Sequence, residues 1–121
     1  MKKITTMIAA AALLGSSALA LAADTKVGIL MDITGPIASF IPPLQNAANL
    51  AIKQVNDQGG LLDGKAVAAY GDTTGSAQGA VDAAGKLVNV ENVAIIMGAL
   101  MSGTTIAAAE AVAIPAGVVQ I

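Results

Sequence analysis

The residues best suited to chemistry in this chain stand between Ala94 and Thr105, in the stretch AIIMGALMSGTT. A short apolar run ends at Gly98 and gives way to small and hydroxyl residues, and a helical pattern resumes at about Thr104. A strand, a glycine-containing turn and a helix start form the junction at which open α/β sheets bind ligands. The helix start offers unpaired backbone N–H groups and the positive end of a dipole. With the hydroxyls of Ser102, Thr104 and Thr105 beside those groups, the stretch predicts a small site for a carboxylate or another anion.

The same stretch nearly matches a nucleotide-binding loop, because Gly98 is followed after four residues by Gly103, Thr104 and Thr105. Threonine stands where that motif requires lysine, and the chain has no arginine to meet the charge of a triphosphate. Nucleotide binding is therefore disfavoured. Two interpretations stay open: a purely structural turn with capping hydroxyls, or a site for a small anionic or zwitterionic ligand.

Catalysis has few candidate groups, since the chain contains no histidine and no cysteine. These absences remove the usual general base, the thiol nucleophile and the commonest metal ligands, and we expect neither a metal nor a cofactor. Asp32 and Asp72 both follow predicted strands, so they could form a carboxylate pair for acid/base work, as in a hydrolase or amidase. The alternative, which we favour, is one turn-stabilising and one helix-capping aspartate.

Two further residues are candidates for contact with a ligand. Phe40 lies in the loop after the first predicted strand, either as a cover for the local core or as a lid against an apolar ligand body. Met101 lies in the loop before Ser102, where a flexible side chain could border the site.

The first 22 residues predict a secretory signal peptide. Lys2 and Lys3 precede a short apolar segment and the small-residue run ALALAA, with cleavage expected after Ala22. Without cysteine, a lipid anchor on an N-terminal cysteine and disulfide bonds are both excluded. We therefore expect a secreted protein that is not embedded in the membrane after cleavage, with residues 23–121 as one small domain.

The remainder of the chain alternates between strand and helix patterns. Strands are predicted at 26–31, 65–70, 93–97 and 117–121; helices are predicted to begin at Pro43, after Ser76 as N-cap, and at about Thr104, the last one stopped by Pro115. This order predicts an α/β fold, a parallel doubly wound (Rossmann-like) sheet with helices on both faces. Four lysines against eight acidic residues leave residues 23–121 at −4 with no basic patch, so nucleic acid is not an expected partner.

Several segments resemble periplasmic solute-binding proteins of ABC importers, of the leucine/isoleucine/valine-binding type. They are DITGPIASF, NLAIKQVNDQGGLLDGK, YGDTTGSAQGAVDAAGKLV and VAIIMGALMSGTTIAAAEAVAIPAGVVQI. The resemblance implies a two-lobed fold of which residues 23–121 would be an incomplete, N-terminal ligand-binding lobe. It also implies capture of a branched-chain or related amino acid between the lobes and delivery to a membrane permease.

By position, the resemblance assigns ligand contacts to four residues. Ser102 corresponds to the hydroxyl that binds the ligand's carboxylate, Phe40 to an aromatic of the first loop, and Met101 and Gly103 to neighbours in the site loop. Pro42-Pro43 departs from the glycine-containing run usual at that place. A sensory or regulatory module on the same lobe is the alternative to a transport component.

Overall fold

The computed structural model describes residues 23–121, and the expected signal peptide, residues 1–22, lies outside them. The described residues form one parallel sheet in the order β2-β1-β3-β4. Its strands are β1 (Thr25–Met31), β2 (Ala66–Asp72), β3 (Ile95–Met97) and β4 (Val119–Gln120). The predicted parallel α/β architecture is confirmed, and the first strand of the chain lies inside the sheet with a neighbour on each side.

Strand β1 is the centre of the sheet because its sequence is apolar on both faces. Four consecutive residues of β1, 27–30, are buried, as expected for a parallel strand covered on both sides. It pairs with β2 over its whole length and with β3 from Val27 to Ile29. The residue that follows β1 therefore stands between the loops that follow β2 and β3.

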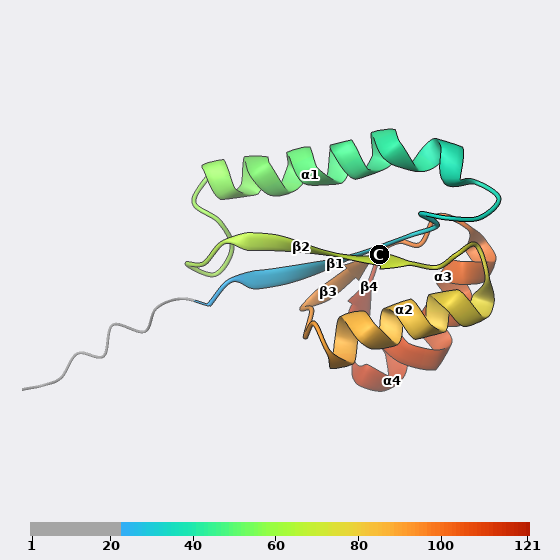
Figure 1. Ribbon diagram of the computed structural model, residues 1–121. Coiled ribbons are helices and arrows are strands. Elements are labelled where there is room, and N and C mark those ends of the chain that lie inside the picture. The colour runs from blue at the N-terminus through green and yellow to red at the C-terminus, as the bar shows by residue number, and fades with distance from the viewer. Residues whose placement is uncertain (1–22) are drawn as a thin grey trace, which may run out of the picture.

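Helices cover both faces of the sheet, but unequally (Figure 1). Helix α1 (Ile41–Asp57) lies alone on one face; α2 (Ala77–Asn89), α3 (Ser102–Ala108) and α4 (Ile114–Ala116) lie on the other. The main core is on the second face, where side chains of β1 and β3 pack against α2, α3 and the turn that follows α3. That core contains Leu30, Ala80, Ala84, Leu87, Val93, Ile96, Ala108 and Ala113.

Helix boundaries depart from the predicted ones in three places. Helix α3 begins at Ser102 rather than at about Thr104. Helix α1 begins at Ile41 rather than Pro43, because a 3₁₀ turn, η1 (Ala38–Phe40), leads into it and the two prolines occupy first-turn positions that need no N–H partner. The sequence predicted that Pro115 stops the last helix, and this prediction is wrong. A π-helical turn, η2 (Ala109–Ala113), joins α3 to α4, and the helix ends only at Gly117, which is left-handed with φ +67°.

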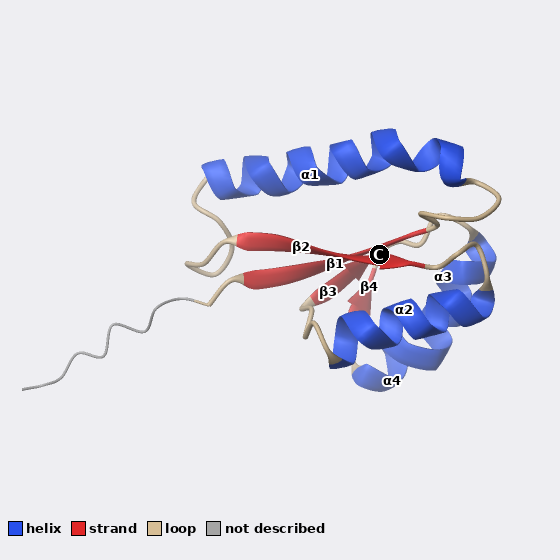
Figure 2. Cartoon of the chain, in the orientation of Figure 1, coloured by secondary structure: helices blue, strands red, loops and turns tan. Residues whose placement is uncertain are grey.

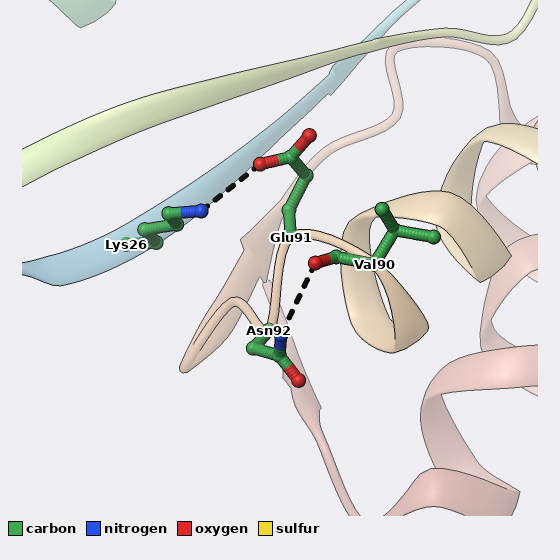
Figure 3. A network of polar contacts seen from close by, with 4 residues as sticks. All are labelled: Lys26, Val90, Glu91 and Asn92. Atoms are coloured by element: carbon green, nitrogen blue, oxygen red, sulfur yellow. Dashed lines mark hydrogen bonds and ion pairs between the residues drawn. The ribbon is translucent and has the colours of Figure 1, made fainter.

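At the amino end of the sheet, a polar contact ties β1 to the segment after α2. Lys26 Nζ lies 3.0 Å from Glu91 Oε2, and the amide of Asn92 donates to the carbonyl of Val90 at 3.1 Å (Figure 3). This end is opposite the loops described next. Within residues 23–121, none of the helices has the length and apolar character needed to cross a bilayer.

Candidate functional site

The candidate site lies at the carboxyl edge of the sheet, where three loops meet. Because β1, β2 and β3 are parallel, the segments that follow them leave the sheet on the same side (Figure 2). These are the loop from Asp32 to η1, the loop from Thr73 to Ser76, and the loop 98–101 before α3. This is the edge at which ligands bind in open α/β sheets.

Asp32 is fully buried beneath these loops. Its Oδ2 accepts hydrogen bonds from the backbone N–H groups of Leu100 and Met101, each at 3.3 Å, and its Oδ1 accepts from the hydroxyl of Thr73. A buried carboxylate needs such donors, because burial without them would be costly. All the hydrogen bonds that Asp32 accepts come from neighbouring loops, and its side chain is not exposed to solvent.

Asp72 is likewise engaged by its surroundings. Its carboxylate accepts from the N–H (3.1 Å) and hydroxyl (2.7 Å) of Thr34 and from the N–H of Thr74 (2.9 Å). Partial burial alone would raise the pKa of Asp72, but the hydrogen bonds from Thr74, Thr34 and the backbone of Ile33 together hold that pKa below its ordinary value. The prediction that one aspartate caps a helix is wrong, because the N-cap of α2 is Ser76, whose Oγ accepts from Gly79 N at 3.0 Å.

The start of α3 brings together three of the four predicted site residues. Met101 is its half-buried N-cap, and Ser102 and Gly103 are exposed in its first turn. The first intrahelical bond at this end runs from Thr105 N to Met101 O at 2.9 Å, so the N–H groups before Thr105 precede the helical ladder. Ser102 thus stands exposed in the first turn of a helix, and its contact with a ligand stays a prediction.

The two threonines of this stretch do not serve the site. Thr104 is buried and its hydroxyl donates to Met101 O at 2.8 Å. The hydroxyl of Thr105 lies within hydrogen-bond distance of Ala99 O (3.1 Å) and Met101 O (2.9 Å). Their expected part in an anion pocket is a wrong prediction, because both hydroxyls satisfy carbonyls of the loop that precedes them.

Phe40 is the fourth predicted residue, and it approaches the edge from the other face. It is the last residue of η1 and the N-cap of α1, with 65% of its surface exposed. Helix α1, whose N-cap is Phe40, and helix α3, which begins at Ser102, lie on opposite faces of the sheet (Figure 1). Its exposure argues against a cover for the local core, and the lid role of Phe40 stays a prediction.

A separate apolar groove of about 360 Å³ lies between α1 and the sheet. Leu44 and Ala48 border it from α1, and Met31, Met97 and Leu100 border it from the strands and the site loop. The four predicted site residues do not line it. Ile41 is the one fully buried residue of α1, so the groove reflects the thin cover on this face.

Asp32 and Gln120 are site-supporting residues whose part the sequence did not reveal. For Asp32 the available signal was a carboxylate placed directly after the apolar run 27–31, because a carboxylate buried there requires donors from neighbouring loops. Gln120 donates from Nε2 to Gly98 O at 2.7 Å and to Thr105 O at 3.2 Å. A glutamine inside a short apolar strand offered a weaker hint.

The fold and this edge define the class: a doubly wound parallel α/β lobe, in which small ligands bind where the strands end. A family model described as periplasmic binding protein matches residues 24–115. The chain belongs to the periplasmic binding protein family, which confirms the resemblance inferred from the sequence.

Individual relatives agree with this assignment. A Leu/Ile/Val-binding protein homolog 7 from Brucella melitensis is 36% identical over 110 residues, covering 91% of this chain and 27% of the relative. The Leu/Ile/Val-binding protein BraC3 from Rhizobium johnstonii is 32% identical over 91 residues, 75% of this chain and 24% of the relative. The chain thus spans about a quarter of the length of these curated relatives.

Solved structures show the same lobe. The branched-chain amino acid transporter substrate binding protein LivJ from Streptococcus pneumoniae, in complex with isoleucine, superposes with a TM-score of 0.75 at 26% identity, covering 81% of this chain and 28% of that one. A solute binding protein from Rhodopseudomonas palustris, in complex with 3,4-dihydroxy benzoic acid, gives a TM-score of 0.71 at 27% identity, covering 80% and 26%. Both of these ligands carry a carboxyl group.

Proposed function

We propose that this chain is the N-terminal part of an extracytoplasmic solute-binding protein of an ABC importer. It would capture a branched-chain or related amino acid and deliver it to a membrane permease after secretion into the periplasm. The names of the relatives support this function. The observation that supports it is the exposed start of α3, where Ser102 and Gly103 lie in the first turn of a helix at the edge where open α/β sheets bind ligands.

Each of the four proposed contacts has a physical role. Ser102 donates its hydroxyl to the ligand's carboxylate, and the first-turn N–H groups at Ser102 and Gly103 add further donors at the positive end of the helix. Gly103 has no heavy atom near the position that a Cβ would take, so a ligand can approach its backbone closely. Met101 borders the loop, and Phe40 covers the apolar part of the ligand from the opposite face.

We propose no catalytic role for Asp32 and Asp72. Every hydrogen bond that the two carboxylates accept comes from a loop of the lobe itself. A general base must instead be able to reach a proton of the substrate. The hydrolase or amidase interpretation therefore gains no support from the site.

The test is a titration of the ¹⁵N-labelled chain with L-leucine, L-isoleucine and L-valine, followed by amide chemical shifts. Because one lobe supplies only part of the contacts, we expect weak binding, with a dissociation constant of about 1 mM or higher. Shifts should be confined to the amides of Phe40 and of residues 101–103, and Ser102→Ala should abolish them.

D-isoleucine and 3,4-dihydroxybenzoate serve as matched probes in the same titration. The first has the composition of the ligand with the wrong configuration, and the second replaces the amino acid while keeping a carboxyl group. A response to the benzoate alone would replace the proposed ligand class. The absence of any response at residues 101–103 would contradict the proposed site. A micromolar dissociation constant would contradict the expectation that tight binding needs contacts from a second lobe.

A further inference from the structure

The segment from Gly98 to Thr105, here called the site segment, is held by side chains from the strands on both sides of it. From the β1 side, the buried carboxylate of Asp32 accepts from the N–H groups of Leu100 and Met101 at 3.3 Å each. The other oxygen of that carboxylate accepts from Thr73, so one side chain joins the loops after β1, β2 and β3.

From the β4 side, Gln120 holds the two ends of the same segment. Its Nε2 donates to Gly98 O at 2.7 Å and to Thr105 O at 3.2 Å. Two carbonyl acceptors fix the orientation of the carboxamide, because the amide oxygen in that position would face them without a proton. The bonds of Gln120 therefore bracket the bonds of Asp32.

These contacts also decide which N–H groups stay available to a ligand. Asp32 occupies the donors of Leu100 and Met101, so a ligand carboxylate has to use Ser102 and the residues after it in the first turn. A site made of backbone donors binds well only when the backbone is already fixed in the binding shape, since ordering it on binding costs free energy.

We infer that Asp32 and Gln120 are positioning residues that preorganise the site segment for ligand binding without touching the ligand. The inference rests on the proposed function, and it adds a role for two residues outside the proposed contact set. A positioning role differs from a contribution to the stability of the core. Loss of positioning changes the order of the site segment and the ligand affinity in molecules that remain folded.

The experiment compares Asp32→Asn, Gln120→Ala and Gln120→Glu with the wild-type chain by amide hydrogen exchange and by titration with L-isoleucine. Asp32→Asn retains the shape but loses the charge and one acceptor. Gln120→Glu retains the shape, but its ionised carboxylate has no proton to donate to the two carbonyls. Asp57→Asn is the matched control, because Asp57 is exposed near the far end of α1 and pairs with Lys53. Exchange at β1 and β2 amides, in the same sample, reports the folded fraction.

Asp32→Asn should speed exchange at Leu100 and Met101 by about tenfold or more relative to β1 amides, since each lost bond to a carboxylate is a strong one. Both Gln120 variants should also speed exchange at the site segment. In each of the three variants, the molecules that remain folded should bind isoleucine several-fold more weakly than the wild-type chain does. Asp57→Asn should leave both readouts unchanged.

Variants with exchange at the site segment equal to that of Asp57→Asn would overturn the inference, and so would faster exchange with unchanged affinity. If Asp32→Asn does not fold, the two Gln120 variants decide the question by the same readouts. A wild-type chain that shows no response to isoleucine overturns the proposed function, and the ligand-related part of the inference with it; the exchange data still show whether these side chains hold the segment.

Discussion

Two glycines in one helix allow the packing around the candidate site to be tested with a single kind of substitution. Gly79 and Gly85 both lie inside α2, and each should weaken it by about 1 kcal/mol relative to alanine on helix propensity alone. The two positions differ in the space available for a side chain. A Cβ at Gly79 would meet Thr73 O at 2.2 Å, whereas at Gly85 the nearest atom is the side-chain nitrogen of Asn89 at 4.0 Å.

The expected magnitudes have opposite signs. Gly85→Ala should stabilise the domain by about 0.5–1 kcal/mol, because the methyl group is accommodated and the unfolded chain loses freedom. Gly79→Ala gains the same propensity but forces a shift of the Thr73 carbonyl, and overpacking of this kind costs about 1–3 kcal/mol or more. The carbonyl cannot move freely, because it accepts from Ser76 N at 3.0 Å while the hydroxyl of Thr73 holds Asp32.

Thermal unfolding of residues 23–121, followed by circular dichroism, measures the difference between the two variants. For a domain of this size, 1 kcal/mol corresponds to a shift of about 4–8 °C in Tm, so Gly85→Ala should unfold several degrees above the wild type and Gly79→Ala below it. Equal Tm values for the two variants, or a Gly79→Ala variant more stable than the wild type, would refute the reasoning from the Thr73 contact.

Four further substitutions test neighbouring features. Ser76→Ala removes the acceptor for Gly79 N and should lower the free energy of unfolding by about 1 kcal/mol in a urea titration, and an unchanged value would show that Ser76 does not act as the cap. Gly98→Ala would place a Cβ 2.0 Å from Leu30 O at φ +114° and should cost more than about 2 kcal/mol, whereas Gly103→Ala, with open space around it, should leave stability within about 1 kcal/mol; equal costs would contradict this. The pKa of Asp72 in the folded chain is lowered. Its carboxylate therefore contributes to the free energy of unfolding above the ordinary aspartate pKa, and this contribution is lost as the pH falls through the lowered value. Acid titration of the stability should thus show wild type and Asp72→Asn converging at low pH, and a gap that widens on acidification would contradict the assignment.

The order of the elements could be predicted from the sequence because each depends on local pattern. Apolar runs gave the strands, and Ser76 as a predicted N-cap gave the start of α2. The same local reasoning failed at Pro115, because it assumes a regular α-helix. The π-helical turn η2 widens the helix just before the proline, and the chain continues to Gly117.

The candidate site was predicted in part for a similar reason. Ser102 and Gly103 were singled out because a strand, a turn and a helix start are adjacent in sequence; the structure leaves both exposed, and their contact with a ligand stays a prediction. The threonines were assigned wrongly because a hydroxyl one turn into a helix can bond either a ligand or the loop carbonyl behind it, and composition does not distinguish the two.

The role of Asp32 depends on strand order, which no local pattern contains. Its partners lie 41, 68 and 69 residues away in the chain. They converge on it only because β1, the first strand, lies between β2 and β3, so that its carboxyl end faces both following loops. In a parallel α/β sheet whose third strand is added on the other side of the first strand, the first strand always ends between two loops. The ligand-binding crevice of such sheets forms at this same point. A polar residue there can fix the loops that bind the ligand, and in this chain the buried carboxylate of Asp32 takes that position.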